Sequence, residues 1–216
     1  MEIAKNIIET SLKMVQSGLV KGTWGNVSVR KENQLWITPS GVTYEDLTED
    51  QIAVIDLESG VQIGGSRKAS SEMPLHRMIY LHNEEINGIV HTHSIYASAF
   101  AAIEEEVPCY TEDQAQIIGG SIPVAQYAFP GTDELGKNVV KALEDGRYAV
   151  LMAKHGLVAV GRNLKEAWTS AEVAEKSAQL ASIVKGMNKA PGGLCEKEIE
   201  DMRRIYLESY SKTSIK

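Results

Sequence analysis

Two histidines placed two residues apart, His91 and His93, follow an apolar segment that begins at Ile86. Because a β-strand directs alternate side chains to opposite faces, both imidazoles are expected on one face, with Thr92 on the other. Two imidazoles that converge from one strand are a suitable pair of ligands for a borderline metal such as zinc. The same residues also fit a plainer interpretation, in which one histidine is hydrogen-bonded and the other lies in water.

A third histidine, His155, comes after an apolar segment at 149–152 and directly before Gly156. A glycine at such a strand end lets the backbone or a ligand approach closely. By itself this histidine fits a structural role, but beside the first pair it completes the three nitrogen ligands of an open catalytic zinc site. The remaining histidines, His76 and His82, fall on a predicted helix and are expected at its surface or at the edge of the core.

A carboxylate, Glu72, is expected in the first turn of that helix, directly after Ser70 and Ser71. One interpretation is ordinary helix stabilisation, with a serine as N-cap and an acidic residue near the positive end of the helix. The other is catalytic, because a carboxylate aimed at a metal-bound substrate can carry a proton to or from carbon or oxygen. The residues leave both interpretations open.

Three polar loops form a second group: residues 23–26, residues 40–41 and residues 70–71. Each offers backbone N–H groups and short polar side chains, and the third opens a helix, so together they could hold a phosphate dianion without lysine or arginine. They could equally be simple turns. The sequence contains neither a Walker motif nor a glycine-rich dinucleotide motif, so a nucleotide ligand is not indicated.

Composition restricts the class of protein. The chain has 216 residues, 43% of them hydrophobic, and a formal net charge of -7. These values are typical of a globular protein and argue against general nucleic-acid binding, which requires clustered basic charge. The two cysteines, Cys109 and Cys195, are expected as free thiols in a reducing compartment. No apolar run approaches the ~18 residues that span a bilayer, and the first residues lack the layout of a signal peptide. A cytoplasmic protein is expected.

The elements that must position the polar residues follow from the spacing of the apolar ones. Helical spacing predicts helices over 2–18, 72–83, 95–102, 132–144, 164–185 and 198–210, the second of them capped by Ser71. Strands are predicted over 27–30, 34–38, 52–57, 86–93, 122–125, 148–152 and 156–160. Residues 43–50 are expected as a polar turn or short helix, 60–71 as a loop, and those from about 211 as a polar tail. No linker divides the chain, so one α/β domain over 1–216 is expected.

Several of these segments, taken in order and spacing, resemble the class II aldolase/epimerase family, whose model also includes the N-terminal domain of adducin. The segments that carry the resemblance run from about residue 3 to about residue 185; they are 22–30 (GTWGNVSVR), 37–41 (ITPSG), 70–72 (SSE), 91–93 (HTH), 129–132 (FPGT) and 154–157 (KHGL). Within the family, the sequence is most similar to the fuculose-phosphate aldolases.

The resemblance implies an α/β domain with a largely antiparallel central sheet covered by helices. It implies one zinc ion per subunit, held by His91, His93 and His155, with Glu72 as the acid/base that also ligates the metal when substrate is absent. It further implies that small polar residues hold the substrate phosphate: Gly25, Asn26, Ser40, Gly41, Ser70 and Ser71. A homotetramer with active sites at subunit interfaces is also implied.

The implied reaction is the reversible cleavage of a ketose 1-phosphate, such as L-fuculose 1-phosphate or a related deoxy-sugar phosphate, to dihydroxyacetone phosphate and an aldehyde. The metal would act as a Lewis acid for the enediolate, and Glu72 would move a proton on that fragment. Fuculose-phosphate aldolases carry a tyrosine that protonates the leaving aldehyde oxygen. Glu112 stands at that position here, and Tyr210 falls where the family has a second tyrosine.

Other members of the family use the same metal frame differently. A pentulose-phosphate 4-epimerase would have aspartates in place of Glu72 and Gln116. A methylthioribulose-1-phosphate dehydratase would eliminate water from a similar substrate. An adducin-like assembly module would be no enzyme, but such modules lose the metal ligands, whereas all are present here. Iron, cobalt or manganese could replace zinc, because nitrogen and oxygen ligands discriminate poorly among these metals.

Overall fold

The computed structural model describes residues 2–187 and 192–210, except the side chains of residues 209 and 210. In this part of the chain, eight strands form one sheet in the order β4-β3-β2-β1-β5-β8-β7-β6, and the β6–β7 pair is parallel whereas its other pairs are antiparallel. The strands are β1 (Asn26–Lys31), β2 (Gln34–Ile37), β3 (Ala53–Asp56), β4 (Gln62–Gly64), β5 (Gly88–Thr92), β6 (Val124–Ala125), β7 (Ala149–Met152) and β8 (Gly156–Gly161). The prediction of an α/β fold with a largely antiparallel sheet is confirmed. The tail predicted from about residue 211 lies outside the described residues.

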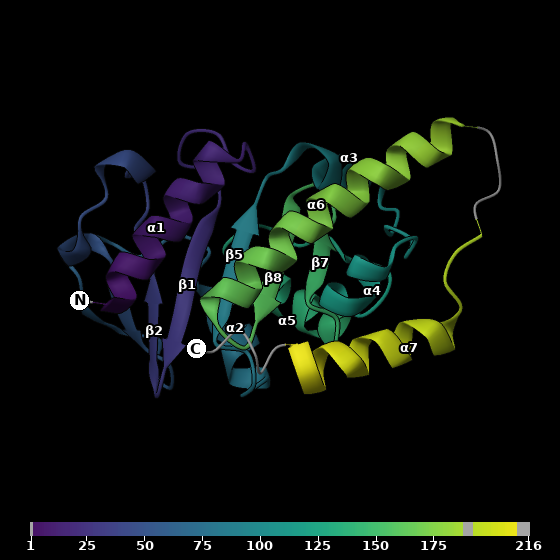
Figure 1. Cartoon of the computed structure of the whole chain (residues 1–216). Helices are drawn as coiled ribbons and strands as arrows, with labels where there is room; N and C mark the ends of the chain where they lie inside the picture. The colour runs from purple at the N-terminus through teal and green to yellow at the C-terminus, as the bar shows by residue number, and fades with distance from the viewer. Residues whose placement is uncertain (1, 188–191, 211–216) are drawn as a thin grey trace.

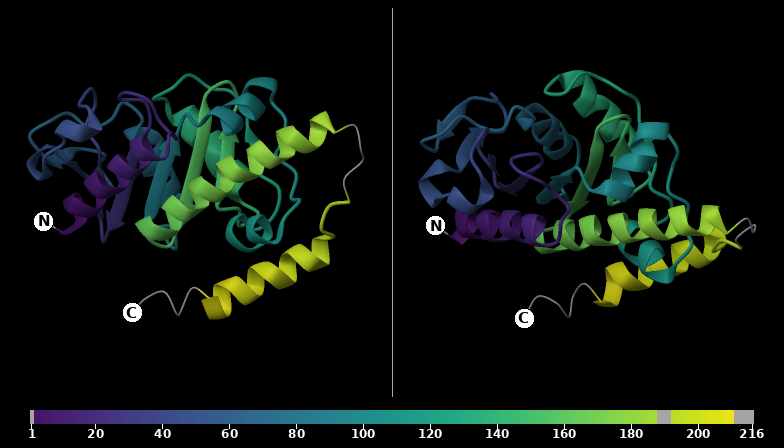
Figure 2. Two further views of the ribbon diagram at one scale, coloured as in Figure 1. Left: turned by 45° about the horizontal axis from the view of Figure 1, so that its top comes forward. Right: turned by 90° about the horizontal axis from the view of Figure 1, so that it is seen from above.

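Helices cover both faces of the sheet (Figure 1). Apolar side chains of α2 (Met73–His82) and α5 (Asp133–Leu143) pack on one face. The other face is covered by α1 (Glu2–Gln16), α3 (Ile95–Ile103), α4 (Glu112–Ile118) and the long α6 (Leu164–Gly186). Seen from above in Figure 2, α1 and α6 form one layer, and the strands lie between that layer and α5.

Strands β7 and β8 carry only apolar residues and glycine because both faces of the sheet are covered there. In β7, Val150 and Met152 belong to the core under α2 and α5, whereas Ala149 and Leu151 belong to the core under α3, α4 and α6. Alternate side chains therefore enter different cores, as the two-residue repeat of a strand requires. This explains why continuous apolar runs, without polar alternation, correctly predicted β7 and β8.

The register of the central strands brings the predicted site residues to one end of the sheet. Asn26 of β1 pairs with His91 of β5, and His91 pairs with Val158 of β8. Strands β7 and β8 form a hairpin in which Met152 pairs with Gly156. The turn between them, which contains the third histidine, therefore lies at the end of β5.

The predicted elements differ from the structure at three places. Residues 60–71 contain the short edge strand β4, whose side chains are exposed and show no apolar alternation. The seven-residue α4 was not among the predicted elements, because two helical turns are too short for a periodic pattern. The predicted cap at Ser71 is wrong: Glu72 occupies the N-cap position of α2, and no side chain caps it. The polar segment 43–50 forms the two 3₁₀ turns η1 (Tyr44–Asp46) and η2 (Glu49–Gln51), as expected.

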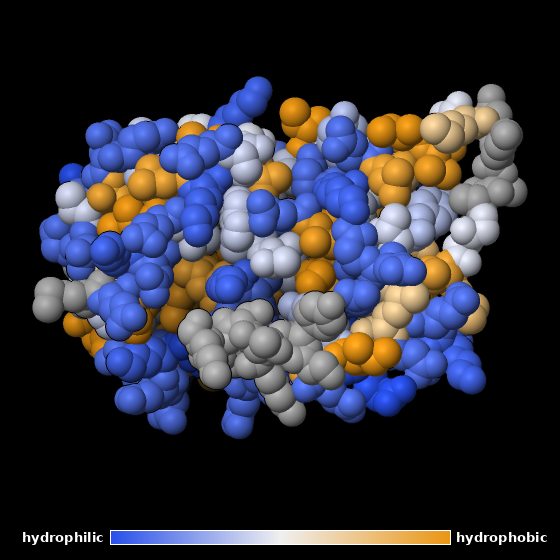
Figure 3. All heavy atoms as spheres, in the orientation of Figure 1, coloured by the Kyte–Doolittle hydropathy of each residue, from blue (hydrophilic) through white to orange (hydrophobic). Residues whose placement is uncertain are grey.

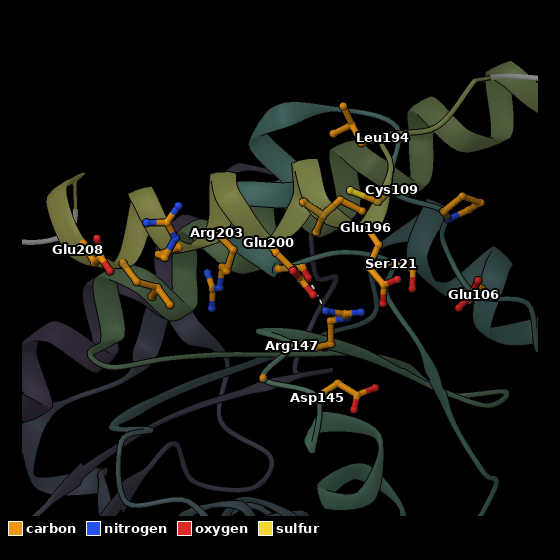
Figure 4. A pocket seen from close by; sticks show the side chains of 16 residues that line it. Glu106, Cys109, Ser121, Asp145, Arg147, Leu194, Glu196, Glu200, Arg203 and Glu208 are labelled. Carbon is orange, nitrogen blue, oxygen red and sulfur yellow. Dashed lines mark hydrogen bonds between the residues drawn. The ribbon is translucent and has the colours of Figure 1, made fainter.

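The last described helix, α7 (Glu196–Ile205), lies along the edge of the molecule next to α4 and is followed by the π-helical turn η3 (Tyr206–Tyr210). None of the residues of α7 is buried. Arg203 joins it to α4 by donating to the carbonyl oxygens of Gln116 (2.8 Å) and Ile117 (2.7 Å). A cavity of about 930 Å³ lies beside α7, and its lining carries charges of both signs, among them Arg147 and Glu200 (Figure 4).

The molecular surface is mainly hydrophilic over α1 and the adjacent part of α6, whereas apolar atoms gather around α3 and the far end of α6 (Figure 3). Exposed apolar side chains there include Ile103 of α3, Ile183 of α6 and Met187, which follows α6. Among the described residues, no helix is both long enough and apolar enough to cross a membrane.

Candidate active site

His91 and His93 converge at the end of β5, as the strand periodicity predicts. His91 is fully buried in β5, and His93 follows the strand by one residue. Their Nε2 atoms are 3.0 Å apart. Thr92, between them, is buried, and its hydroxyl donates to Oγ of Ser94 at 3.3 Å.

His155 reaches the same place from the turn between β7 and β8. Lys154 precedes it with a left-handed φ of 58°, which turns the chain tightly enough to bring the imidazole over the sheet end. The His155 ring centroid is 5.0 Å from that of each other histidine, and ligand nitrogens of all three lie within 4.8 Å of one another. Gly156 allows this approach, because a Cβ there would lie 2.5 Å from the carbonyl oxygen of Thr92.

Glu72 completes the group from the N-terminus of α2. Its side chain is buried beside the histidines, with Oε2 3.1 Å from Nε2 of His91 and Oε1 3.2 Å from Nε2 of His155. The carboxylate therefore points into the histidine group. Of the two interpretations that the sequence left open, this geometry favours the functional one, since the carboxylate does not cap the helix.

The spacing of these four groups fits a metal ion. With metal–nitrogen distances of 2.0–2.1 Å, the ligand atoms of a tetrahedral zinc site are about 3.4 Å apart, and the contacts of His91 with His93 and Glu72 are close to this value at 3.0 and 3.1 Å. Nδ1 of His91 donates to the carbonyl oxygen of Leu157 (2.9 Å), which leaves its Nε2 lone pair directed at the group. Nδ1 of His155 is buried without a hydrogen-bond partner. The group is therefore able to bind a metal.

The protonation states agree with this use. Burial, together with the charge on His91, lowers the pKa of His93 to about 3 and that of His155 to about 4, so both are neutral near pH 7. Burial alone would raise the pKa of Glu72, but His91, His155 and a hydrogen bond from Asn26 hold it well below its usual range. Burial alone would lower the pKa of His91, but the Glu72 carboxylate raises it. A proton on His91 and a metal cation would therefore compete for the same Nε2.

The loops expected to hold phosphate meet beside this group. Gly25 adopts a φ of +96°, and a Cβ there would lie 2.6 Å from the carbonyl oxygen of His91, so the loop before β1 touches the metal-binding strand. The side-chain amide of Asn26 donates to Oγ of Ser70 at 3.2 Å. The other two loops are joined by backbone hydrogen bonds, from Ser70 N–H to the carbonyl oxygen of Thr38 (3.1 Å) and from Ser40 N–H to that of Lys68 (3.0 Å).

The backbone N–H groups of Ser40 and Ser70 are thus engaged within the protein. Ser40, Gly41 and Ser71 are exposed, so their polar groups face solvent. The side-chain amide of Asn26 is engaged as well, since it contacts Ser70, Glu72 and His76. Phosphate binding by the exposed residues of these loops stays a prediction.

Of the two predicted proton donors, Glu112 has a described side chain, and it does not join the group. Glu112 is exposed in the first turn of α4, a helix that packs on α6 and α7. It is absent from the described side chains whose ligand atoms converge with the three histidines. The side chain of Tyr210 lies outside the described part of the structure.

The expected place of His76 was wrong. It is fully buried and makes hydrogen bonds with Asn26 and Ser28, whereas His82 is exposed as expected. Burial lowers the pKa of His76 to about 3, so the ring is neutral. The sequence periods give part of this arrangement, since Asn26 and Ser28 share one face of a strand and His76 lies one helical turn after Glu72, but they do not show that the two faces meet.

Beside the histidines lies a mostly apolar cavity of about 380 Å³, lined by Gly18, Val20, Lys21, Trp24, His93 and Ile95. The Trp24 ring centroid is 5.8 Å from that of His93, and 67% of the tryptophan is exposed. Trp24 was not among the predicted site residues, although it lies between Gly22 and Gly25 in the loop expected to hold phosphate.

Comparison with known proteins agrees with this geometry. Residues 5–182 match the family model described as "Class II Aldolase and Adducin N-terminal domain". A "5-deoxy-D-ribulose 1-phosphate aldolase" of Bacillus thuringiensis is 36% identical over 210 residues, which cover 96% of each chain. An "L-fuculose phosphate aldolase" of Escherichia coli K12 is 39% identical over 179 residues, covering 83% of this chain and 82% of the relative. A solved "L-fuculose 1-phosphate aldolase" superposes with a TM-score of 0.91 at 35% identity, covering 95% of this chain and 96% of the other.

The chain belongs to the class II aldolase and adducin N-terminal family. Its relatives by sequence and by structure include class II aldolases, which are lyases, among them fuculose-phosphate aldolases and a 5-deoxyribulose 1-phosphate aldolase. The predicted resemblance is confirmed, and the chain is an enzyme of this class.

Proposed function

We propose that the protein is a zinc-dependent aldolase that cleaves a ketose 1-phosphate to dihydroxyacetone phosphate and an aldehyde. One observation carries this proposal: three imidazoles and one carboxylate, from separate elements, converge with contacts of 3.0 to 3.2 Å. His91, His93 and His155 would hold one zinc ion per subunit, and Glu72 would join them when substrate is absent. When bound, the metal would supply Lewis-acid stabilisation of the negative charge that develops on the substrate oxygens.

Glu72 is the proposed acid/base. Because its pKa is held below the usual range, the group is a carboxylate at neutral pH and can accept a proton. It is buried beside the histidines and tethered by Asn26 at 2.9 Å, so a substrate bound at the histidines would place its reacting carbons within reach. In cleavage, the C4 hydroxyl would lose one proton as the C3–C4 bond breaks, and Glu72 would deliver one proton to C3 of the three-carbon fragment, so no net proton is consumed.

Gly25, Asn26, Ser40, Gly41, Ser70 and Ser71 are the proposed phosphate-binding residues. The proximity of the three loops to Glu72 supports this role, since Ser70 Oγ also accepts a hydrogen bond from Glu72 N–H at 3.3 Å. Phosphate binding there would anchor the unreactive end of the substrate. Binding energy spent at that end fixes the geometry at the reacting carbons.

The substrate is proposed to end in a methyl group, as L-fuculose 1-phosphate and 5-deoxyribulose 1-phosphate do. The apolar side chains of Val20, Trp24 and Ile95 form a cavity that touches His93 and offers few partners for a terminal hydroxyl. The names of the relatives agree with a deoxy-sugar phosphate.

A homotetramer with active sites at subunit interfaces is proposed as the working assembly. Trp24 and Ile95 line the cavity at His93 and are 67% and 65% exposed, so a neighbouring subunit could cover apolar surface there. In such an assembly Glu112 and Tyr210 would be the candidate proton donors from a neighbouring subunit. A cytoplasmic location is proposed because both cysteines, Cys109 and Cys195, are free thiols.

A substrate panel tests the reaction. Ketose 1-phosphates and 5-phosphates with and without a terminal hydroxyl would be assayed in parallel for dihydroxyacetone phosphate, epimerised product and dehydrated product, and metal content would be measured on the same protein. We expect dihydroxyacetone phosphate, the highest kcat/KM for a terminal methyl group, and one zinc per chain. Dehydrated or epimerised product as the main outcome would reassign the protein to a dehydratase or an epimerase, and no metal with no activity would indicate an assembly module.

A further inference from the structure

A continuous chain of buried polar side chains leads from the core to Glu72. Ser28 and His76 are fully buried, Tyr80 is 1% exposed and Asn26 is 3% exposed. Buried polar groups cost free energy unless they are hydrogen-bonded. None of these contacts is needed to hold a metal, so the presence of four such groups in one row requires its own explanation.

The chain has a fixed direction that starts at the carboxylate. An ionised carboxylate only accepts hydrogen bonds, so the side-chain nitrogen of Asn26 donates to Oε2 of Glu72 at 2.9 Å. The amide oxygen of Asn26 must then face the other way, where it lies 2.5 Å from Nε2 of His76. An amide oxygen only accepts, so Nε2 of His76 carries the proton.

The rest of the chain follows from that tautomer. A neutral imidazole protonated at Nε2 accepts at Nδ1, so the hydroxyl of Ser28 donates to Nδ1 of His76 at 2.6 Å. The hydroxyl of Tyr80 lies 2.8 Å from Ser28 Oγ and donates to it. The hydrogen bonds therefore all run in one direction, from Tyr80 through Ser28 and His76 to Asn26. If one of them were reversed, the next would have two donors or two acceptors facing each other.

We propose that His76 is a positioning residue that fixes the Asn26 amide with its NH₂ group toward Glu72. This inference rests on the proposed function, because it assigns Glu72 the catalytic proton. Without His76 the buried amide oxygen of Asn26 loses its hydrogen-bond donor, and an unpartnered buried acceptor costs free energy. The amide would then shift toward another donor, and Glu72, no longer held by the NH₂ group, would leave the position between His91 and His155.

The helix geometry supports the same role. Glu72 stands at the N-cap position of α2 and His76 follows one turn later, so both face β1, which carries Asn26 and Ser28. Glu72 and His76 therefore both belong to α2, and the residues that connect them, Asn26 and Ser28, belong to β1. A purely structural role, in which His76 only joins α2 to β1, would affect stability but would not depend on which atom the ring presents to Asn26.

Variants of His76 separate these two roles. In the zinc-loaded enzyme, His76→Leu should lower kcat by about 10- to 100-fold, as expected for a misplaced catalytic group, while KM and zinc content change by no more than about threefold. His76→Gln offers an amide N–H to Asn26 and an oxygen to Ser28, so it should recover most of kcat. Tyr80→Phe, at the far end of the chain, is the matched control and should stay within about twofold of the wild type. Unchanged kcat in His76→Leu would overturn the proposal, as would a kcat in His76→Gln as low as that in His76→Leu.

Should His76→Leu fail to fold, Ser28→Ala keeps the imidazole and removes the donor that fixes its tautomer. We expect a several-fold lower kcat, and no loss would contradict the proposal. A readout independent of activity is ¹⁵N NMR of the His76 ring, which should show a proton on Nε2 and none on Nδ1. A ring protonated at Nδ1 would end the proposal even in an active enzyme. If no sugar phosphate is cleaved, the proposed function fails, whereas the NMR result still decides how the ring is oriented.

Discussion

The end of the sheet around β5, β8 and α2 and the edge beside α7 are built in opposite ways. At the first, Asn26, Glu72 and His91 are buried and each has hydrogen-bond partners inside the protein. At the second, α7 buries no residue, and the charged groups of both signs beside it border an open cavity. Burying polar groups costs free energy, whereas charges in water cost little. The polar groups around the three histidines are thus held by hydrogen bonds inside the protein, whereas those beside α7 border an open cavity, so substitutions should have very different effects at the two places.

The largest effect is expected for His93→Ala. Removal of one of three nitrogen ligands should abolish zinc binding and lower turnover by about 10³-fold or more. Because His93 is only partly buried and follows the end of β5, the fold should be retained. Metal analysis, circular dichroism and the cleavage assay on one preparation would test this. Normal zinc content with a normal rate would show that the three-histidine group has no catalytic role.

Glu72→Gln should follow, with kcat lower by about 10²- to 10⁴-fold. The amide keeps the shape of the side chain but cannot accept the proton, so binding of the phosphate end should be spared. Kinetics combined with titration of dihydroxyacetone phosphate by calorimetry would separate the two effects. Full activity in this variant would mean that another group carries the proton.

The stability of the metal-free protein should fall on acidification. Burial lowers the pKa of His76 from 6.5 to about 3. Below about pH 6.5, His76 is therefore protonated in the unfolded chain but stays neutral in the folded protein, which favours unfolding. The free energy of unfolding is therefore highest above that pH. Protonation of His76 in the unfolded chain lowers it by about 2 kcal/mol between about pH 6.5 and 5. Urea unfolding at several pH values should therefore show a shallower loss in His76→Gln than in the wild type. Equal slopes would show that His76 is protonated in the folded state.

The smallest effect is expected at the α7 edge. Glu200→Gln removes one charge from the lining of the open cavity, so kcat, zinc content and the free energy of unfolding should stay close to the wild type, within about 0.5 kcal/mol for the last. This variant is the control for the substitutions at the metal group. A large loss of activity in Glu200→Gln would show that the region beside α7 also contributes to activity, so that the two regions do not differ in this respect.

The sequence predicted the elements and the positions of the three histidines correctly wherever a single periodicity of apolar residues determined them. Alternation along β5 placed His91 and His93 together, and apolar runs identified β7 and β8, so the strand ends that carry the three histidines were predictable. Short or exposed elements such as β4 and α4 lack a repeating pattern and were missed.

What the sequence could not reveal depended on contacts between distant elements. Asn26 and His76 are 50 residues apart, and only the packing of α2 on β1 brings them within hydrogen-bond distance. A lone histidine on an amphipathic helix gives no sign of whether it faces water or a polar partner. The same holds for Ser71, which resembles a helix cap, although the helix begins one residue later with Glu72 at the N-cap.

Gly25 and Gly156 approach the two successive carbonyl groups at the end of β5, and a Cβ at either position would come within 2.6 Å of one of them. Neither position has room for a larger residue, so the ligand-bearing strand is locked by main chain on both sides. Adaptation of this scaffold to a new aldehyde would therefore have to proceed through its rim. Trp24 and Ile95, whose side chains reach into solvent, are the places where directed evolution could change selectivity while the metal group stays intact.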